Sequence, residues 1–305
     1  MARPGITKSV FHGVRRFLGL ATPGRSLQIL PDDVFLVSFP KSGNTWTRFL
    51  VGNLIFPDRP VTFANIHVSV PCLWSTSTRD FDQMPRPRVI KSHECFDPRY
   101  PRVVYIVRDP RDVVISQYHY YRKVRYIGDD LPIETFVDQF VAGEACRGSW
   151  AHGSWGQNVL TWLATSEGDP RFIMLRYEDM MADACRELTK IARFLGLNAT
   201  AANITQAVET SSATRMRKLE QACSLKSGIG LWGPESRKDL MFVRAAVAGG
   251  WRKDLPTPMV EKIEAAWGPV MRHLGYELAS QTLSEARQCV PWNRSQLTVG
   301  VSSRL

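Results

Sequence analysis

The chain has 305 residues, of which 44% are hydrophobic and 22% are charged, and this composition excludes a chain that is disordered throughout. A chain of this length suits one large α/β domain or two smaller ones. Lysine and arginine outnumber aspartate and glutamate by 39 to 29, and the resulting net charge of +10 favours an anionic partner: a nucleic acid, an acidic membrane or a phosphorylated small molecule.

Residues 1–28 are predicted to be a basic amphipathic leader. Its apolar residues recur at helical spacing, opposite His12, Arg15 and Arg16. Such a helix can lie on a membrane surface. A helix packed on the domain, or a frayed leader, is the alternative. The main domain is expected over residues 29–278, with a tail over residues 279–305.

The cysteines and the hydropathy of the chain predict a cytoplasmic protein. The 6 cysteines form no CxxC pair and no metal-ligand spacing, so we expect reduced thiols and no bound metal. No apolar run reaches the roughly 18 residues that a membrane-spanning helix needs. Basic residues interrupt the N-terminal apolar stretch, which is untypical of a signal peptide.

Residues 34–46, VFLVSFPKSGNTW, predict a strand, a tight turn and the start of a helix. Gly43 allows backbone conformations that other residues resist, Lys41 adds a charge, and the helix dipole attracts anions. Ser42, Asn44 and Thr45 can donate hydrogen bonds to a phosphate or cap the helix. The segment therefore predicts a P-loop-like phosphate-binding turn. The lysine precedes the glycine, which disfavours a metal-dependent NTPase of the Walker type. An ordinary turn with a solvated lysine is the alternative.

Four nearly continuous apolar runs predict the strands of a parallel sheet. They span residues 34–38, 88–92, 103–107 and 172–176. Amphipathic helices are predicted at about 45–55, 111–123, 133–142, 155–165, 184–195, 203–218 and 258–273. This alternation predicts a three-layer α/β fold with a central parallel sheet flanked by helices. Only about ten residues separate the second and third runs, which is short for a parallel crossover.

Polar residues follow all four predicted strands and should meet at one edge of the sheet, where such folds bind ligands. They are Lys41, then Lys91 with Ser92 and His93, then Arg108, and finally Tyr177. This convergence predicts a phosphate site.

Residues 102–122 predict a second phosphate-binding segment. Arg108 ends a strand and can offer a planar fork to a phosphate, Asp109 and Pro110 suit a helix start, and Ser116 follows inside that helix. In the alternative interpretation, Arg108 pairs with Asp109 or Asp112, and Ser116 bonds within its own helix.

His93 is the candidate general base, because it lies beside Lys91 between the two phosphate segments and imidazole accepts protons near neutral pH. A structural or surface histidine is the alternative. His119 is the only rival among the other histidines, since it lies in the second phosphate segment.

Three of these motifs resemble those of the sulfotransferase family, which transfers a sulfuryl group from 3′-phosphoadenosine-5′-phosphosulfate (PAPS). PKSGNTW resembles the 5′-phosphosulfate loop, VRDPRDVVIS the 3′-phosphate segment, and KSH the family's Lys-Thr-His element. The resemblance implies that His93 is the general base, that Lys41 stabilises the leaving group and that Lys91 assists at the transferring group. It further implies that PAPS is bound by Lys41, Ser42, Gly43, Asn44, Thr45, Trp46, Arg108 and Ser116.

The distal third is similar to the family in part. The segment RFIMLRYEDM implies that Tyr177 contacts the adenine nucleotide. Ser211 begins a Ser-Ser-Ala triplet at the place of the family's Thr-Ser-Phe. The resemblance implies that Ser211 contacts the cofactor near the adenine, but the aromatic residue that would stack there is missing from this chain. Arg244 retains the arginine of an Arg-Lys-Gly element, whereas Ala246 replaces its glycine.

The sequence therefore predicts a PAPS-dependent sulfotransferase that modifies a hydroxyl, or as second choice an amine, of a small molecule. Two alternatives stay open: a small-molecule kinase or other nucleotide-dependent transferase, and a non-enzymatic basic protein that binds nucleic acid or anionic lipid. Neither nucleic acid nor a metal is expected as a partner of the enzyme. The family's dimerisation pattern is not met, so the oligomeric state stays open.

Overall fold

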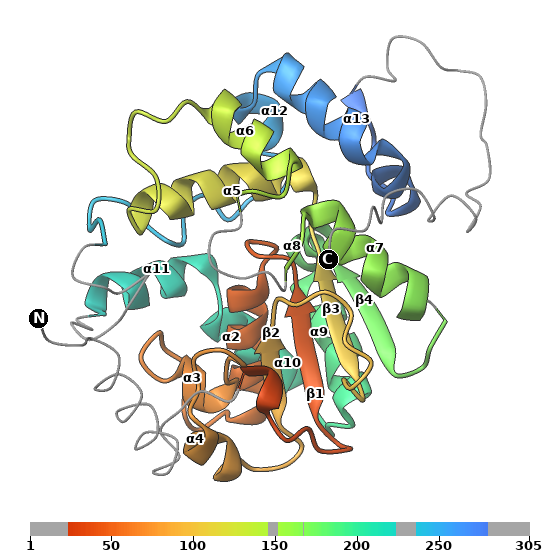
Figure 1. Cartoon of the computed structure of the whole chain (residues 1–305). Coiled ribbons are helices and arrows are strands. Elements are labelled where there is room, and N and C mark those ends of the chain that lie inside the picture. Colours follow the sequence, from red (N-terminus) through yellow and green to blue (C-terminus); the bar gives the residue numbers. More distant parts are fainter. Residues whose placement is uncertain (1–23, 146–151, 167, 224–235, 280–305) are drawn as a thin grey trace, which may run out of the picture.

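Four parallel strands form the centre of the molecule. The computed structural model describes residues 24–145, 152–166, 168–223 and 236–279, so the predicted leader and tail lie almost entirely outside the described residues. The strands are β1 (Val34–Ser38), β2 (Val89–Ser92), β3 (Val103–Val107) and β4 (Phe172–Arg176), in the spatial order β2-β1-β3-β4 (Figure 1). The predicted strands and their parallel pairing are thereby confirmed.

The burial of the strands agrees with their order in the sheet. Every residue of β1 and β3 is buried, as expected for the inner strands of a parallel sheet covered on both faces. In register, Leu36 of β1 lies opposite Lys91 of β2 and Val104 of β3. Just before β2, the buried Arg88 pairs with Asp33 at 2.6 Å, which ties the entrances of the two strands together.

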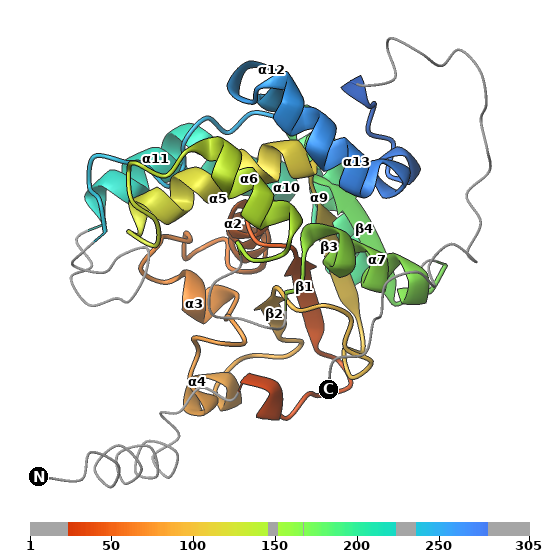
Figure 2. The same ribbon diagram turned by 45° about the horizontal axis from the view of Figure 1, so that its top comes forward.

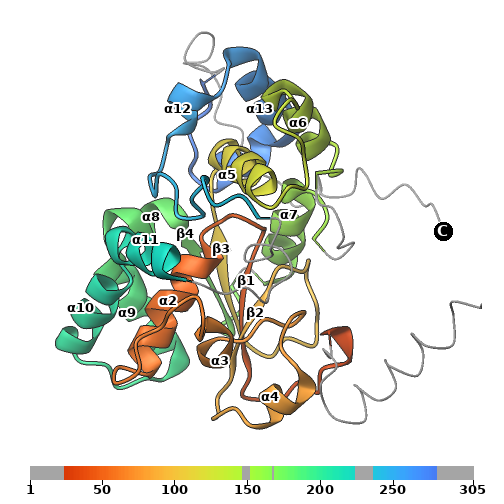
Figure 3. The same ribbon diagram turned by 90° about the vertical axis from the view of Figure 1, so that its left-hand side faces the viewer.

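Helices cover both faces of the sheet, as Figure 3 shows. On one face, α2 (Asn44–Ile55), α9 (Ala184–Leu195) and α10 (Ala201–Thr210) pack against inward side chains such as Val34 and Leu36. On the other face, Tyr105 packs on Trp162 of α7 (Trp155–Ser166), with ring centroids 5.9 Å apart. The same hydrophobic core continues to α6 (Ile133–Val141) and α13 (Thr257–His273), which lie beyond the ends of the strands (Figure 1). These layers confirm the predicted three-layer α/β fold.

A group of helices lies beyond the carboxyl ends of the strands (Figures 1 and 2). This group includes α5 (Pro110–Lys123), whose N-cap Asp109 accepts a hydrogen bond from the backbone N–H of Arg111 at 2.9 Å. The group also includes α11 (Ala213–Ala222) and α12 (Trp251–Asp254). Shorter elements complete the described fold: η1 (Gly24–Ser26), α3 (Ile66–Ser69), α4 (Thr78–Asp82) and α8 (Tyr177–Ala182).

The single helix predicted over residues 203–218 is instead two helices, α10 and α11. The helix is interrupted at Ser211 and Ser212, because Ser212 adopts an extended conformation with φ −62° and ψ 148°. Two side chains of α2 bind this turn: Trp46 donates its indole N–H to the Ser211 carbonyl at 3.1 Å, and Asn53 donates to the Ser211 hydroxyl at 2.9 Å. These tertiary contacts outweigh the helical periodicity of the sequence.

The short connection between β2 and β3 contains no helix. Because β1 lies between the two strands, residues 93–102 cross from one side of β1 to the other. Tyr100 of this segment stacks on Phe35 of β1, with ring centroids 3.6 Å apart, and its hydroxyl donates to Glu94 at 2.6 Å. The segment therefore takes the covering position that a helix would occupy in a longer crossover.

Candidate active site

A cavity of about 530 Å³ opens at the carboxyl ends of the strands. Its walls come from the β1–α2 turn, the end of β2, the helix α5, and the segment 242–250. The predicted site residues that line it are Lys41, Gly43, Asn44, Thr45, Trp46, Lys91, His93, Arg108, Ser116, Tyr177 and Arg244. Ser42 and Ser211 do not line it, and neither does the rival histidine, His119.

The β1–α2 turn presents backbone N–H groups to this cavity. Gly43 is the N-cap of α2, with φ +101°, and a Cβ atom there would lie 2.5 Å from the Tyr177 ring. Only glycine fits both the conformation and the space. No side chain caps α2, and the first N–H groups of a helix have no partner within it, so they are available to an anion.

Two polar side chains of the turn differ in what they contact. The Ser42 hydroxyl is buried and has no hydrogen-bond partner among the described residues. The Asn44 amide points back to the strand, where it donates to the Leu36 carbonyl and the Ser38 hydroxyl, both at 3.2 Å. Asn44 thus fixes the end of β1 with its amide nitrogen, and its unpaired Oδ1 is an acceptor that an anion cannot use, whereas Ser42 retains an unused buried hydroxyl that can donate.

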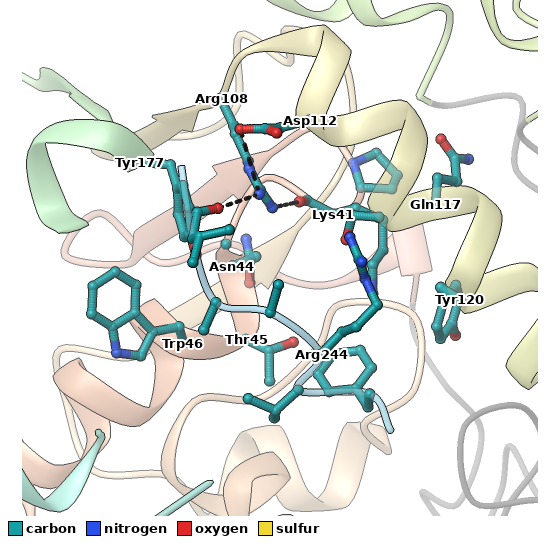
Figure 4. A pocket seen from close by; sticks show the side chains of 18 of the residues that line it. Lys41, Asn44, Thr45, Trp46, Arg108, Asp112, Gln117, Tyr120, Tyr177 and Arg244 are labelled. Atoms are coloured by element: carbon teal, nitrogen blue, oxygen red, sulfur yellow. Dashed lines mark hydrogen bonds and ion pairs between the residues drawn. The ribbon is translucent and has the colours of Figure 1, made fainter. Parts of the chain in front are cut away.

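The Lys41 ammonium group lies between two aromatic rings, 4.2 Å from the centroid of Tyr120 and 4.1 Å from that of Phe242. Burial and, to a smaller extent, the neighbouring charge of Arg108 lower the pKa of Lys41 to about 7, against an opposing contribution from Glu220. An anion placed in the turn would restore the charge. Figure 4 shows Lys41 beside Tyr120 and Arg108.

Arg108 joins the turn to the distal segment. It donates to the carbonyls of Lys41 at 3.3 Å and Val247 at 3.1 Å, and its guanidinium lies 4.3 Å from the centroid of the Tyr177 ring (Figure 4). Its Nε is buried without a partner in the described part of the chain. The contact to Asp112 is long, at 3.8 Å.

The two aspartates near Arg108 have stronger partners of their own. Asp109 pairs with Arg111 at 2.7 Å, while Asp112 accepts hydrogen bonds from the backbone N–H groups of Gly249 at 2.7 Å and Trp251 at 2.9 Å. Of the competing interpretation, the pairing of Arg108 with Asp112 is present as a long ion pair, and Asp109 pairs with Arg111 instead. Ser116 follows on α5 and lines the same cavity.

An aromatic pair forms the wall next to the turn: the rings of Trp46 and Tyr177 meet edge to face with centroids 5.8 Å apart. Opposite this wall, Arg244 forms an ion pair with Asp254 at 3.6 Å. Ala246 has φ +52°, so this alanine adopts the left-handed conformation that the family's glycine would adopt easily. Ser211 lies outside the cavity, and its hydroxyl accepts a hydrogen bond from Asn53.

His93 is held in one tautomer. Its Nδ1 lies 2.7 Å from the Ser38 carbonyl oxygen, and because a carbonyl only accepts, Nδ1 carries the proton and Nε2 has the free lone pair. Burial lowers the pKa of His93 well below 6.5, and the charges of Lys91 and His152 lower it further. The imidazole is therefore neutral at physiological pH and can accept a proton.

Lys91 lies beside a cysteine. Its ammonium Nζ is 3.5 Å from the Cys72 sulfur, and burial lowers the pKa of Lys91. Burial of the Cys72 thiol opposes its ionisation, but the charges of Lys91 and Arg48 bring its pKa down to about 7. Arg48 and His152 also line the cavity and carry no motif or spacing signal in the sequence, so sequence reasoning missed them.

Comparison with known proteins identifies the family. Residues 31–275 match the model of the sulfotransferase domain. Sulfotransferase 1A1 of Bos taurus is 26% identical over 276 residues, which cover 85% of this chain and 90% of the bovine protein. The chain therefore belongs to the sulfotransferase family, and the predicted enzyme class, a PAPS-dependent sulfotransferase, is confirmed.

Two solved structures share the fold. Mouse sulfotransferase SULT7A1 complexed with PAP (3′,5′-adenosine bisphosphate, the product of PAPS) is 22% identical with a TM-score of 0.63, and the match covers 83% of this chain and 89% of that one. Retinol dehydratase in complex with retinol and PAP is 19% identical with a TM-score of 0.66, covering 85% and 86%.

No helix in the described part of the chain is long and apolar enough to cross a bilayer. Within the same residues, no group of three or more histidine, cysteine, aspartate or glutamate side chains is arranged to hold a metal ion. The unpaired Ser42 hydroxyl and Arg108 Nε are buried hydrogen-bond donors, and the phosphate oxygens of a bound nucleotide would supply acceptors for them.

Proposed function

We propose that this protein transfers the sulfuryl group of PAPS to a hydroxyl group, or as second choice an amine, of a small molecule, with His93 as general base. One observation carries the assignment of residues. Arg108 Nε, after β3, and the lone pair of His93, after β2, belong to residues that line one cavity, and the unpaired Ser42 hydroxyl is buried in the β1–α2 turn that forms one of its walls.

The binding roles follow from these positions. The N–H groups of Gly43, Asn44 and Thr45 and the Ser42 hydroxyl would hold the 5′-phosphosulfate, since a helix N-terminus favours anions. Arg108, Ser116 and Arg244 would hold the 3′-phosphate. Trp46 and Tyr177 would bind the adenine, while Ser211 would act through Trp46, whose indole it fixes.

In the proposed catalytic step, these residues accept the proton and stabilise the charge that the reaction releases. The acceptor hydroxyl donates a hydrogen bond to Nε2 of His93, and its oxygen forms a bond to sulfur as the bond from sulfur to the phosphate oxygen breaks. The proton moves to His93, and the negative charge moves to the departing phosphate. Lys41 stabilises that charge, and Lys91 stabilises the transferring group. The low pKa of His93 keeps the base unprotonated before each turnover.

The proposed partners are a small-molecule acceptor and an adenine nucleotide with a 3′-phosphate, not a nucleic acid. The retinol complex of retinol dehydratase supports a small-molecule acceptor in this fold. We place the protein in the cytoplasm, which the free thiols of Cys72, Cys95, Cys185 and Cys223 support. We assign the catalytic domain to residues 29–278. A membrane contact of the leader stays a prediction.

A thermal-shift comparison tests the proposal. PAP should stabilise the protein far more than ADP at equal concentration, because only a nucleotide with a 3′-phosphate would offer an anion to Arg108 and Ser116. Equal shifts would contradict the assigned donor site.

A substitution tests the base. His93→Gln should retain the PAP-induced shift and lose turnover by at least about 100-fold, the size of effect expected for a general base. Turnover at the wild-type rate would remove His93 from this role.

A further inference from the structure

His152 places a second imidazole at the acceptor end of the cavity. It comes from the chain just before α7, 59 residues after His93 in the sequence, and it lines the same cavity. The two rings meet edge to face, with centroids 5.5 Å apart and an interplanar angle of 87°. None of the donor-binding contacts described above uses this histidine.

Hydrogen bonds fix His152 in place. Its Nδ1 donates to the carbonyl oxygen of His93 at 3.0 Å. Asn158 donates its amide to the carbonyls of both histidines, at 3.1 Å for His93 and 3.2 Å for His152. The Cys95 thiol donates to the His152 carbonyl at 3.3 Å. The residue is thus built into the site rather than left on a free loop.

These contacts set the tautomer of His152. Since Nδ1 faces a carbonyl oxygen, it carries the proton and leaves Nε2 with a lone pair. Burial and, to a smaller extent, the charge of Lys91 lower the pKa of His152 to about 4, so the ring is neutral. Among the described residues, neither Nε2 atom has a hydrogen-bond partner. The cavity therefore contains two neighbouring imidazole nitrogens that can only accept hydrogen bonds.

We propose that His152 binds the acceptor by accepting a hydrogen bond from a second hydroxyl next to the one that is sulfated, so that the acceptors are compounds with two adjacent hydroxyl groups. This inference rests on the proposed function, in which His93 takes the proton of the reacting hydroxyl. A single hydroxyl has one proton and satisfies one nitrogen. An acceptor with one hydroxyl therefore leaves Nε2 of His152 desolvated without a partner, which costs roughly tenfold to a hundredfold in affinity.

Matched pairs of simple probes test the substrate class. Calorimetry on the PAP-saturated protein compares catechol with phenol, and cis-1,2-cyclohexanediol with cyclohexanol. We expect each diol to bind at least about tenfold more tightly than its single-hydroxyl partner. Equal affinities within both pairs, including no measurable binding of any of the four probes, would overturn the proposal. The comparison of PAP with ADP uses no acceptor, so failure of the donor assignment is recognised separately.

Two substitutions separate substrate binding from a purely structural role. His152→Asn keeps a donor at the Nδ1 position for the His93 carbonyl but removes the Nε2 acceptor. His152→Gln keeps an acceptor at the Nε2 position and loses the Nδ1 contact. We expect His152→Asn to abolish the preference for diols while single-hydroxyl probes bind as before, and His152→Gln to retain part of the preference. Retained preference in His152→Asn, with both probe types weakened in His152→Gln, would show a structural residue and overturn the proposal.

Discussion

Lys41 should make nucleotide binding depend on pH in a range where ordinary lysines do not titrate. Its ammonium lies between the rings of Tyr120 and Phe242, and its pKa is lowered to about 7 in the ligand-free protein. A 5′-phosphate in the turn favours the charged form and raises this pKa again. Binding therefore takes up a proton, and affinity must fall as the pH rises above the pKa of the free protein.

The size of the effect follows from the pKa of about 7. At pH 7.5 about a quarter of the free protein carries the Lys41 proton, so PAP binding should take up about 0.7 to 0.8 of a proton. Between pH 7 and pH 8.5 the dissociation constant should rise roughly 15-fold, provided that the pKa in the complex lies well above 8.5. A lysine with its ordinary pKa would give no change over this range.

Calorimetry of PAP binding in buffers with different ionisation enthalpies measures the proton uptake directly. Lys41→Met should weaken binding and abolish the uptake, whereas Lys41→Arg should abolish the uptake while keeping a charge on the turn. Cys72 also has a pKa of about 7, so Cys72→Ser is the control and should leave the uptake intact. A dissociation constant that stays flat to pH 8.5, or an uptake that persists in Lys41→Met, would refute the reasoning.

Three further predictions concern the frame of the site. Gly43→Ala should lower the free energy of unfolding by about 1–3 kcal/mol and PAP affinity by more than about tenfold, because its Cβ meets Tyr177; Gly196→Ala, with φ +75° and open space, should leave PAP affinity unchanged in the same thermal and binding assays. Arg108→Lys should reduce the preference for PAP over ADP roughly tenfold in competition binding, and an unchanged ratio would exclude the planar fork. Asn44→Ala should cost about 1–3 kcal/mol in denaturant unfolding, because two buried groups of β1 lose their donor; a change below about 0.5 kcal/mol would contradict this.

The sequence predicted the sheet well because its strands are buried on both faces. Continuous apolar runs such as residues 34–38 and 103–107 have few other stable placements, and both match the observed strands to the residue. The turn was predictable for a related reason. Gly43 is required by its φ of +101° and by the nearby Tyr177 ring, so the motif records a local geometric constraint.

The parts that the sequence did not predict depend on contacts between distant segments. The break at Ser211 is fixed by Trp46 and Asn53 of α2, more than 150 residues earlier. His152 approaches His93 through the packing of α7 on the sheet, and no spacing in the sequence signals that pair. The Asn44 side chain contacts the strand rather than a ligand because Ser38 and Leu36 lie behind it.

The strand order also has a consequence for how such an enzyme can diverge. In the proposed function, the inner strand β1 leads to the turn for the 5′ end of the donor, the inner strand β3 beside it leads to Arg108 for the 3′ end, and the edge strand β2 leads to His93. The half of the sheet that grips the donor is thus separate from the edge that faces the acceptor. Substitutions near the end of β2, such as those at His152, which contacts His93, can change the acceptor that is sulfated while the donor stays the same.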